Sequence, residues 1–142
     1  MQTLDTVRFN NTAIKELPVD PIIENYPRKV QACVSRVQPT PIKNPHLVCF
    51  SSNALDLLDL DLNETNKLKF VKYLSGNQLP SGSQPIAYCY CGHQFGHFAG
   101  QLGDGRAISI GEIVNRESER WELQLKGCGK TPYSRQVMDE LF

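Results

Sequence analysis

A glycine-rich run between positions 92 and 106, GHQFGHFAGQLGDGR, is the part of the sequence best suited to holding a ligand. Glycines this frequent weaken helices and strands, and successive backbone N–H groups in such a loop can cradle an anion. Arg106 adds a planar, permanently charged group that matches phosphate oxygens. The alternative is a tight hairpin turn at Gly103-Asp104-Gly105, with Arg106 in solvent.

Lys126 is the second candidate for binding an anion. It ends the run RWELQLK, in which one tryptophan and two leucines alternate with polar residues. Alternation of this kind predicts a strand with one buried face, so we expect Lys126 to point away from the core. A strand lysine that follows a glycine-rich hairpin is the order found in the nucleotide lobe of protein kinases. The alternative is a lysine on a solvated strand face.

A Walker-type phosphate loop is suggested by Gly129-Lys130-Thr131. The first glycine of that motif would fall at position 124, which is Gln124. The residues after Pro132 also lack an apolar helical repeat. We therefore do not expect a Walker motif.

A metal site is the other alternative. The residues of suitable type are Cys89, Cys91, His93 and His97. Thiolates and imidazoles are the ligands that zinc prefers, but structural zinc sites usually separate paired cysteines by about two or more residues. The pattern is compatible with a small metal-binding module and also with cysteines that simply pack within a strand.

The elements that must position these residues follow from periodicity and punctuation. Six of the nine prolines lie in the first 45 residues, which predicts an extended, turn-rich segment there. The expected strands are Val30–Val37, Ile86–Cys91, Ala107–Val114 and Arg120–Lys126, the last two joined by a polar turn. The expected helices are Ala54–Leu60, capped by Ser52 or Asn53, and about Glu64–Leu74, which ends at Ser75-Gly76-Asn77.

Composition bounds the class of protein. The chain has 142 residues, is 40% hydrophobic and 21% charged, and carries no net charge, which is typical of one globular domain or part of one. Zero net charge gives no reason to expect a nucleic-acid or membrane partner. No targeting peptide is visible, and no apolar run approaches a membrane span. Five scattered cysteines then indicate reduced thiols in an intracellular protein.

Long motifs resemble the selenoprotein O family, called YdiU in bacteria. They are GHQFG from Gly92, GQLGDGR from Gly100, WELQLK from Trp121 and TPYSR from Thr131. The resemblance implies a protein-kinase-like fold that binds ATP in an inverted orientation. It also implies transfer of AMP, with Mg²⁺, to Ser, Thr or Tyr hydroxyls of other proteins. Bacterial members of the family are cytoplasmic and eukaryotic members mitochondrial.

Carried onto this chain, the resemblance implies that Gly103, Gly105 and Arg106 contact the nucleotide and that Lys126 contacts its phosphates. The implied fold is α+β: a proline-rich and helical segment (1–85), then an incomplete kinase-like N-lobe with an antiparallel sheet and a glycine-rich hairpin (86–135). After Arg135 the family continues with Asp-Gly-Arg, whereas this chain has Met138 and Asp139 there and ends in QVMDELF.

The segment 136–142 is therefore expected to be the divergent tail of a truncated product. The family's catalytic aspartate and metal ligands have no counterpart in the chain, so no catalytic or metal-binding residue is assigned. We expect the chain alone to be inactive in AMP transfer. The alternative is an ATP-binding or regulatory fragment without catalysis.

Overall fold

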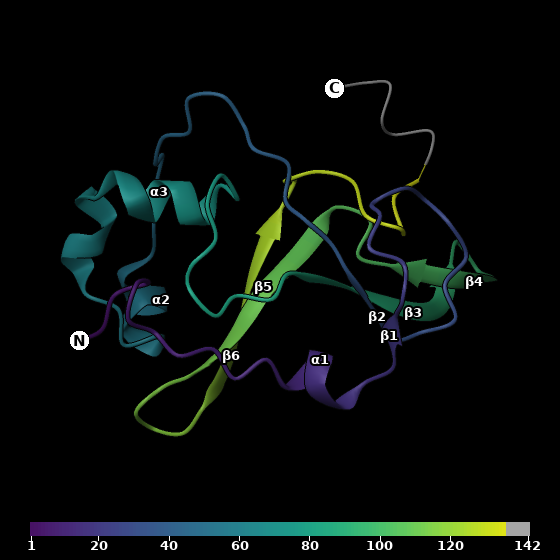
Figure 1. Ribbon diagram of the computed structural model, residues 1–142, viewed down its shortest axis with the longest axis horizontal. Helices are drawn as coiled ribbons and strands as arrows, with labels where there is room; N and C mark the ends of the chain where they lie inside the picture. Colours follow the sequence, from purple (N-terminus) through teal and green to yellow (C-terminus); the bar gives the residue numbers. More distant parts are fainter. Residues whose placement is uncertain (136–142) are drawn as a thin grey trace.

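A mixed, mostly antiparallel sheet organises the molecule (Figure 1). The computed structural model describes residues 1–135, so the expected tail, with Met138 and Asp139, lies outside the described residues. The strands are β1 (Val19–Asp20), β2 (Val34–Arg36), β3 (Ile86–Gln94), β4 (His97–Gly103), β5 (Ala107–Val114) and β6 (Arg120–Lys126). Their order is β1-β2-β3-β5-β6, with β4 paired to β3, and only β1 and β2 run parallel. The α+β class is confirmed.

β5 and β6 have the bounds that alternation predicted. Their antiparallel register pairs Ile108 with Leu125 and Ile113 with Trp121, with a shift between Ser109 and Gly111. An extra residue on one strand turns the following side chains to the opposite face. The bulge therefore places Ile108 and Ile113, five positions apart, on the same face.

The apolar face of β6 is buried at one end only. Leu125 is 6% exposed and Leu123 is half-buried, whereas Trp121 is 37% exposed. The prediction that all three side chains belong to the core is thus right for Leu125 and wrong for Trp121. The reason is that β6 is the edge strand of the sheet, so Trp121 lies at the border of the cluster that buries its register partner Ile113 completely. Its indole N–H donates instead to Glu119 over 3.2 Å.

Four short helices precede β3: α1 (Thr12–Glu16), α2 (Ser52–Leu57), η1 (Leu62–Asn66) and α3 (Leu68–Leu74). α2 begins earlier than predicted because the Ser51 hydroxyl caps it, accepting from the Ala54 N–H over 3.4 Å. The second expected helix is broken, because Lys67 is extended (φ −92°, ψ 133°). Gly76 ends α3 at φ +77°, as predicted for the C-cap. α1 was not predicted.

Two buried clusters hold these elements together. The first comprises Leu4, Val7, Leu55, Leu60, Phe70, Tyr73 and Ile113. The second comprises Val37, Ala87, Ile108, Ile110, Leu125, Cys128 and Tyr133. In Figure 1, α2 and α3 gather at one end of the molecule and the β3–β4 hairpin extends at the other. Strands from both sides of the expected boundary at residue 85 share the sheet, and the division into domains remains a prediction.

Within residues 1–135, no helix has the length and apolar character needed to cross a membrane.

Candidate functional site

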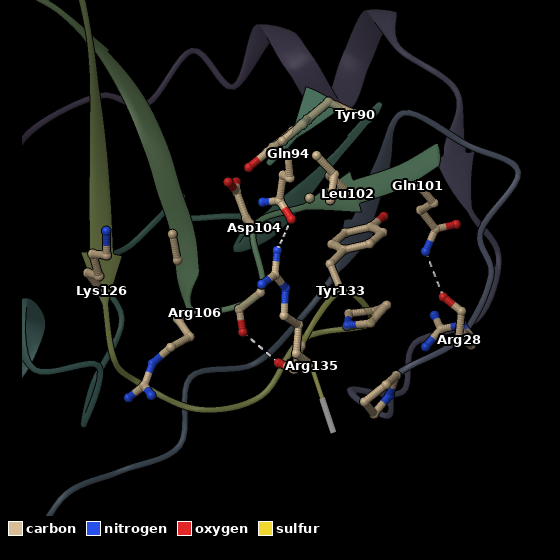
Figure 2. Close-up of a pocket in the computed structure, with 16 residues that line it drawn as sticks. Arg28, Tyr90, Gln94, Gln101, Leu102, Asp104, Arg106, Lys126, Tyr133 and Arg135 are labelled. Carbon is tan, nitrogen blue, oxygen red and sulfur yellow. Dashed lines mark hydrogen bonds between the residues drawn. The ribbon is translucent and has the colours of Figure 1, made fainter. Parts of the chain in front are cut away.

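A pocket of about 640 Å³ opens between the β3–β4 hairpin, the start of β5, the end of β6 and residues 27–28 and 132–135 (Figure 2). This volume lies in the usual range for small-molecule sites, roughly 300–1,000 Å³. Its lining includes all four residues predicted to bind ATP: Gly103, Gly105, Arg106 and Lys126. The structure thus brings them together, and their contact with a nucleotide remains a prediction.

The cationic side chains of the pocket come from strand ends that the sheet places next to each other. Ala107 at the start of β5 is the register partner of Lys126 at the end of β6. The Gly127 N–H donates to the Arg106 carbonyl over 2.7 Å and closes the pairing. Arg28 and Arg135 also line the pocket, against a single carboxylate among the lining residues. Arg28 is paired with Asp20, and the three other cations against one acid still favour an anionic ligand.

That carboxylate belongs to Asp104, which follows β4 and is half-buried. Burial raises its pKa, and the charge of Glu122 raises it further, against the lowering effects of the Tyr88 N–H and of Lys126. The Asp104 side chain accepts that N–H over 3.1 Å, and its own N–H donates to the Tyr88 carbonyl over 2.9 Å. Asp104 therefore fastens the end of β4 to β3.

The glycine-rich run forms a hairpin, but its turn is not at Gly103-Asp104-Gly105, where the sequence suggested one. The hairpin between β3 and β4 turns at Phe95 (φ +51°) and Gly96 (φ +81°). Gly103-Asp104-Gly105 instead connects β4 to β5, two strands that do not pair with each other. The alternative of a hairpin turn at 103–105 was wrong, because the sequence offers several glycines and only pairing selects among them.

Gly103 and Gly105 are needed for a close approach of chain segments. A Cβ atom at Gly103 would lie 2.5 Å from Cγ of Tyr133 and 2.6 Å from the Tyr88 carbonyl oxygen. One at Gly105 would lie 2.8 Å from the Tyr133 carbonyl oxygen. The Ser134 hydroxyl donates to the Gly105 carbonyl over 2.5 Å and fixes this contact. Packing alone thus explains both glycines, whatever else they bind.

A buried polar network supports the pocket from below, and sequence reasoning missed it. The hydroxyls of Ser35 and Tyr133 lie 2.8 Å apart, and Ser35 donates to the Asp20 carboxylate over 3.0 Å. Arg28 forms an ion pair with the same carboxylate over 2.5 Å. Burial raises the pKa of Tyr133 to about 12, so the phenol stays protonated and can donate. No local motif marks these residues, because they lie far apart in the sequence.

The metal-binding alternative gains no support from the geometry. Among residues 1–135, no group of three or more His, Cys, Asp or Glu side chains is placed to hold a metal ion. The His93 ring packs edge-on against Phe98, with centroids 5.3 Å apart. Cys89 is half-buried, and burial raises the pKa of its thiol. The four candidate ligands are therefore explained as residues that build β3 and the start of β4.

A family model described as Protein adenylyltransferase SelO matches residues 15–140. This chain belongs to the SelO family. It is 55% identical over 128 residues to "Protein nucleotidyltransferase YdiU" of Methylobacillus flagellatus, a match that covers 89% of this chain and 25% of the relative. It is 51% identical to "Protein adenylyltransferase SelO-1, mitochondrial" of Danio rerio, covering 95% and 21%. The SelO protein of Mus musculus, also mitochondrial, is 50% identical, covering 92% and 21%.

The family membership confirms the resemblance seen in the glycine-rich and lysine motifs. The chain spans only about a quarter or less of the length of these relatives. Within that length, residues 1–135 contain the whole lining of the pocket.

Proposed function

We propose that the pocket binds ATP and that this chain is the nucleotide-binding part of a protein adenylyltransferase. The observation that carries the proposal is the meeting of Arg106 and Lys126 at adjacent strand ends in one pocket, in a chain of the SelO family. Two neighbouring cations suit a triphosphate, whose charge is concentrated at one end of the ligand.

The proposed fold of this part is a protein-kinase-like N-lobe. A mostly antiparallel sheet, a glycine-rich β3–β4 hairpin and a lysine on a later strand support this proposal. In kinases these parts cover and neutralise the phosphates. The proposed inverted orientation of ATP would present the α-phosphate to the acceptor, with the β- and γ-phosphates held by the protein.

The proposed reaction moves AMP from ATP to a Ser, Thr or Tyr hydroxyl of another protein. The hydroxyl oxygen gives up its proton to a base or to water and forms a bond to the α-phosphorus, the bond from that phosphorus to the bridging oxygen breaks, and pyrophosphate leaves. Negative charge grows on the phosphate oxygens during this step. Arg106 and Lys126 would offset this charge, since preorganised cations and N–H groups contribute most where charge develops.

Mg²⁺ is the metal expected with ATP, and the described residues do not supply a site for it. Asp104 is the one carboxylate lining the pocket, and its side chain is engaged by the Tyr88 N–H. No group of metal-binding side chains occurs within residues 1–135. We therefore assign no metal ligand here, and propose that the 142-residue chain binds ATP without transferring AMP by itself.

Thermal unfolding with and without millimolar MgATP tests nucleotide binding. At a ligand concentration about 100 times Kd, we expect the free energy of unfolding to rise by roughly 2.7 kcal/mol. Lys126→Ala and Arg106→Ala should each remove most of the shift. Lys43→Ala, an exposed lysine outside the pocket, should retain it. An unchanged transition in the wild-type chain would refute nucleotide binding.

Transfer of label from ATP carrying a radioactive α-phosphate to acceptor proteins tests the second part of the proposal. We expect no labelled protein with the 142-residue chain, and label that is lost in Lys126→Ala would contradict this. The proposed partners are ATP and protein hydroxyls. The proposed compartment is the mitochondrion in a eukaryote, following the relatives named mitochondrial, and the cytoplasm in a bacterium.

A further inference from the structure

Tyr90 on β3 is an aromatic side chain of the pocket that the fold itself does not use. Its side chain lines the pocket beside that of Leu102, its cross-strand partner on β4. The residue is 51% exposed, and Leu102 is half-buried. Figure 2 shows Tyr90 on the hairpin strands above the pocket, apart from the β6 strand that carries Lys126. The hairpin therefore contributes an aromatic and an apolar wall.

The Tyr90 hydroxyl has no hydrogen-bond partner within residues 1–135, which sets it apart from the other tyrosines of the sheet and core. Tyr73 donates to Asp5, Tyr88 donates to Glu122, and Tyr133 bonds to Ser35. A buried or packed tyrosine normally finds a partner for its hydroxyl. No side-chain hydrogen bond within residues 1–135 therefore engages Tyr90, and its half-exposed ring lines the pocket beside Leu102.

We infer that Tyr90 stacks on the nucleobase of the bound nucleotide, an inference that rests on the proposed function. The pocket has two chemically different parts: the strand ends with Arg106 and Lys126, and the hairpin wall of Tyr90 and Leu102. A nucleotide has the same division, with a charged phosphate chain and a flat aromatic base. Bases stack on aromatic side chains, and Leu102 adds apolar surface beside the ring.

Two phenylalanines of the same hairpin provide matched controls. Phe95 is 95% exposed and Phe98 is 62% exposed, and neither lines the pocket. They are aromatic and belong to the same two-stranded element, so general effects of truncating the hairpin would be shared with Tyr90. An effect confined to Tyr90 would come from the pocket.

The test compares the affinity of the 142-residue chain for MgATP and for magnesium tripolyphosphate, which has the phosphates but no base. We expect Tyr90→Ala to weaken MgATP binding at least about fivefold and to leave tripolyphosphate binding unchanged. Tyr90→Phe, which keeps the ring, and Phe98→Ala should bind both ligands like the wild type. Lys126→Ala should weaken both.

The outcomes separate this inference from the proposed function. Unchanged MgATP binding in Tyr90→Ala, or an equal loss for both ligands, would overturn the stacking role and leave nucleotide binding intact. A wild-type chain that binds neither ligand would overturn the proposed function and the stacking role with it. Circular dichroism of each variant is the control for folding: a spectrum like that of the wild type shows that a loss of binding does not come from loss of the sheet.

Discussion

The Arg28 side chain bonds to several residues of the segment that precedes β2, and its replacement should lower the stability of the fold. Its side chain is 9% exposed and forms an ion pair with Asp20, itself 6% exposed, over 2.5 Å. The guanidinium also donates to three carbonyls: those of Ile22 (3.0 Å), Glu24 (2.6 Å) and Tyr26 (3.1 Å). Removing one partner of a buried pair leaves the other charge without compensation.

We predict that Arg28→Gln lowers the free energy of unfolding by about 3–5 kcal/mol. The matched control is Arg120→Gln, since Arg120 is 54% exposed and pairs with Glu112 over 2.5 Å at the surface. An exposed pair contributes only about 0–1 kcal/mol, because water and salt screen it. The two variants remove the same group, so the difference between them comes from the burial of the Arg28–Asp20 pair and from the three carbonyls that Arg28 alone contacts.

Urea unfolding followed by circular dichroism at 25 °C measures both variants against the wild type. Equal losses in Arg28→Gln and Arg120→Gln, or a loss below about 1 kcal/mol in Arg28→Gln, would refute the reasoning. A natural domain has only about 5–15 kcal/mol of stability, so Arg28→Gln can unfold the chain outright. Arg28→Lys keeps a charge near Asp20 and should then give an intermediate loss.

The same network predicts a pH dependence. Burial alone would raise the pKa of Asp20, but hydrogen bonds from the Ile22 N–H, Arg28 and Ser35 outweigh it and hold that pKa below its ordinary value. A carboxyl with a lowered pKa stabilises the fold above its unfolded pKa of about 3.9. This contribution is lost as the pH falls through the lower, folded pKa. The free energy of unfolding of the wild type should therefore fall between about pH 4 and pH 2. The fall should be smaller in Arg28→Gln, which lacks one of the hydrogen bonds that lower the Asp20 pKa.

Two further predictions concern single positions. Gly105→Ala should lower the stability by about 1–3 kcal/mol, because the new Cβ meets the Tyr133 carbonyl at 2.8 Å. Gly92→Ala is the control, because its Cβ would have ordinary contact with the Leu102 side chain at 3.4 Å and should lower the stability little. Urea unfolding measures both variants, and an equal loss of stability in the two would contradict the close approach at Gly105. Exposed Cys91 should react with a thiol reagent in the folded chain, whereas Cys128 should react only on unfolding, since burial raises its thiol pKa. Fast labelling of Cys128 at neutral pH would contradict this.

Local patterns predicted the strongest elements of the fold. The bounds of β5 and β6 follow from alternating apolar residues and a polar turn, which act within a few positions of each other. The glycine that ends α3 follows from a requirement for positive φ at one residue. In both cases the cause of the structure lies within the segment itself.

Other predictions depended on contacts outside the segment and were wrong. The helix expected from residue 64 to 74 is interrupted at Lys67, and the hairpin turn falls at Phe95 and Gly96. Trp121 lacks the cover that its alternating neighbours suggested. Each outcome depends on which distant segment packs against the residue, and spacing within a segment does not contain that information.

The sequence by itself determined the SelO-like motifs, the strands of the β5–β6 pair and the presence of Arg106 and Lys126 near strand ends. Only the tertiary structure decided that these cations line one pocket, because the register of β5 against β6 joins positions about twenty residues apart. It also decided the support beneath the pocket, where Ser35 and Tyr133 are 98 positions apart. Buried polar groups must find partners, and those partners are set by the folded chain rather than by neighbours in sequence.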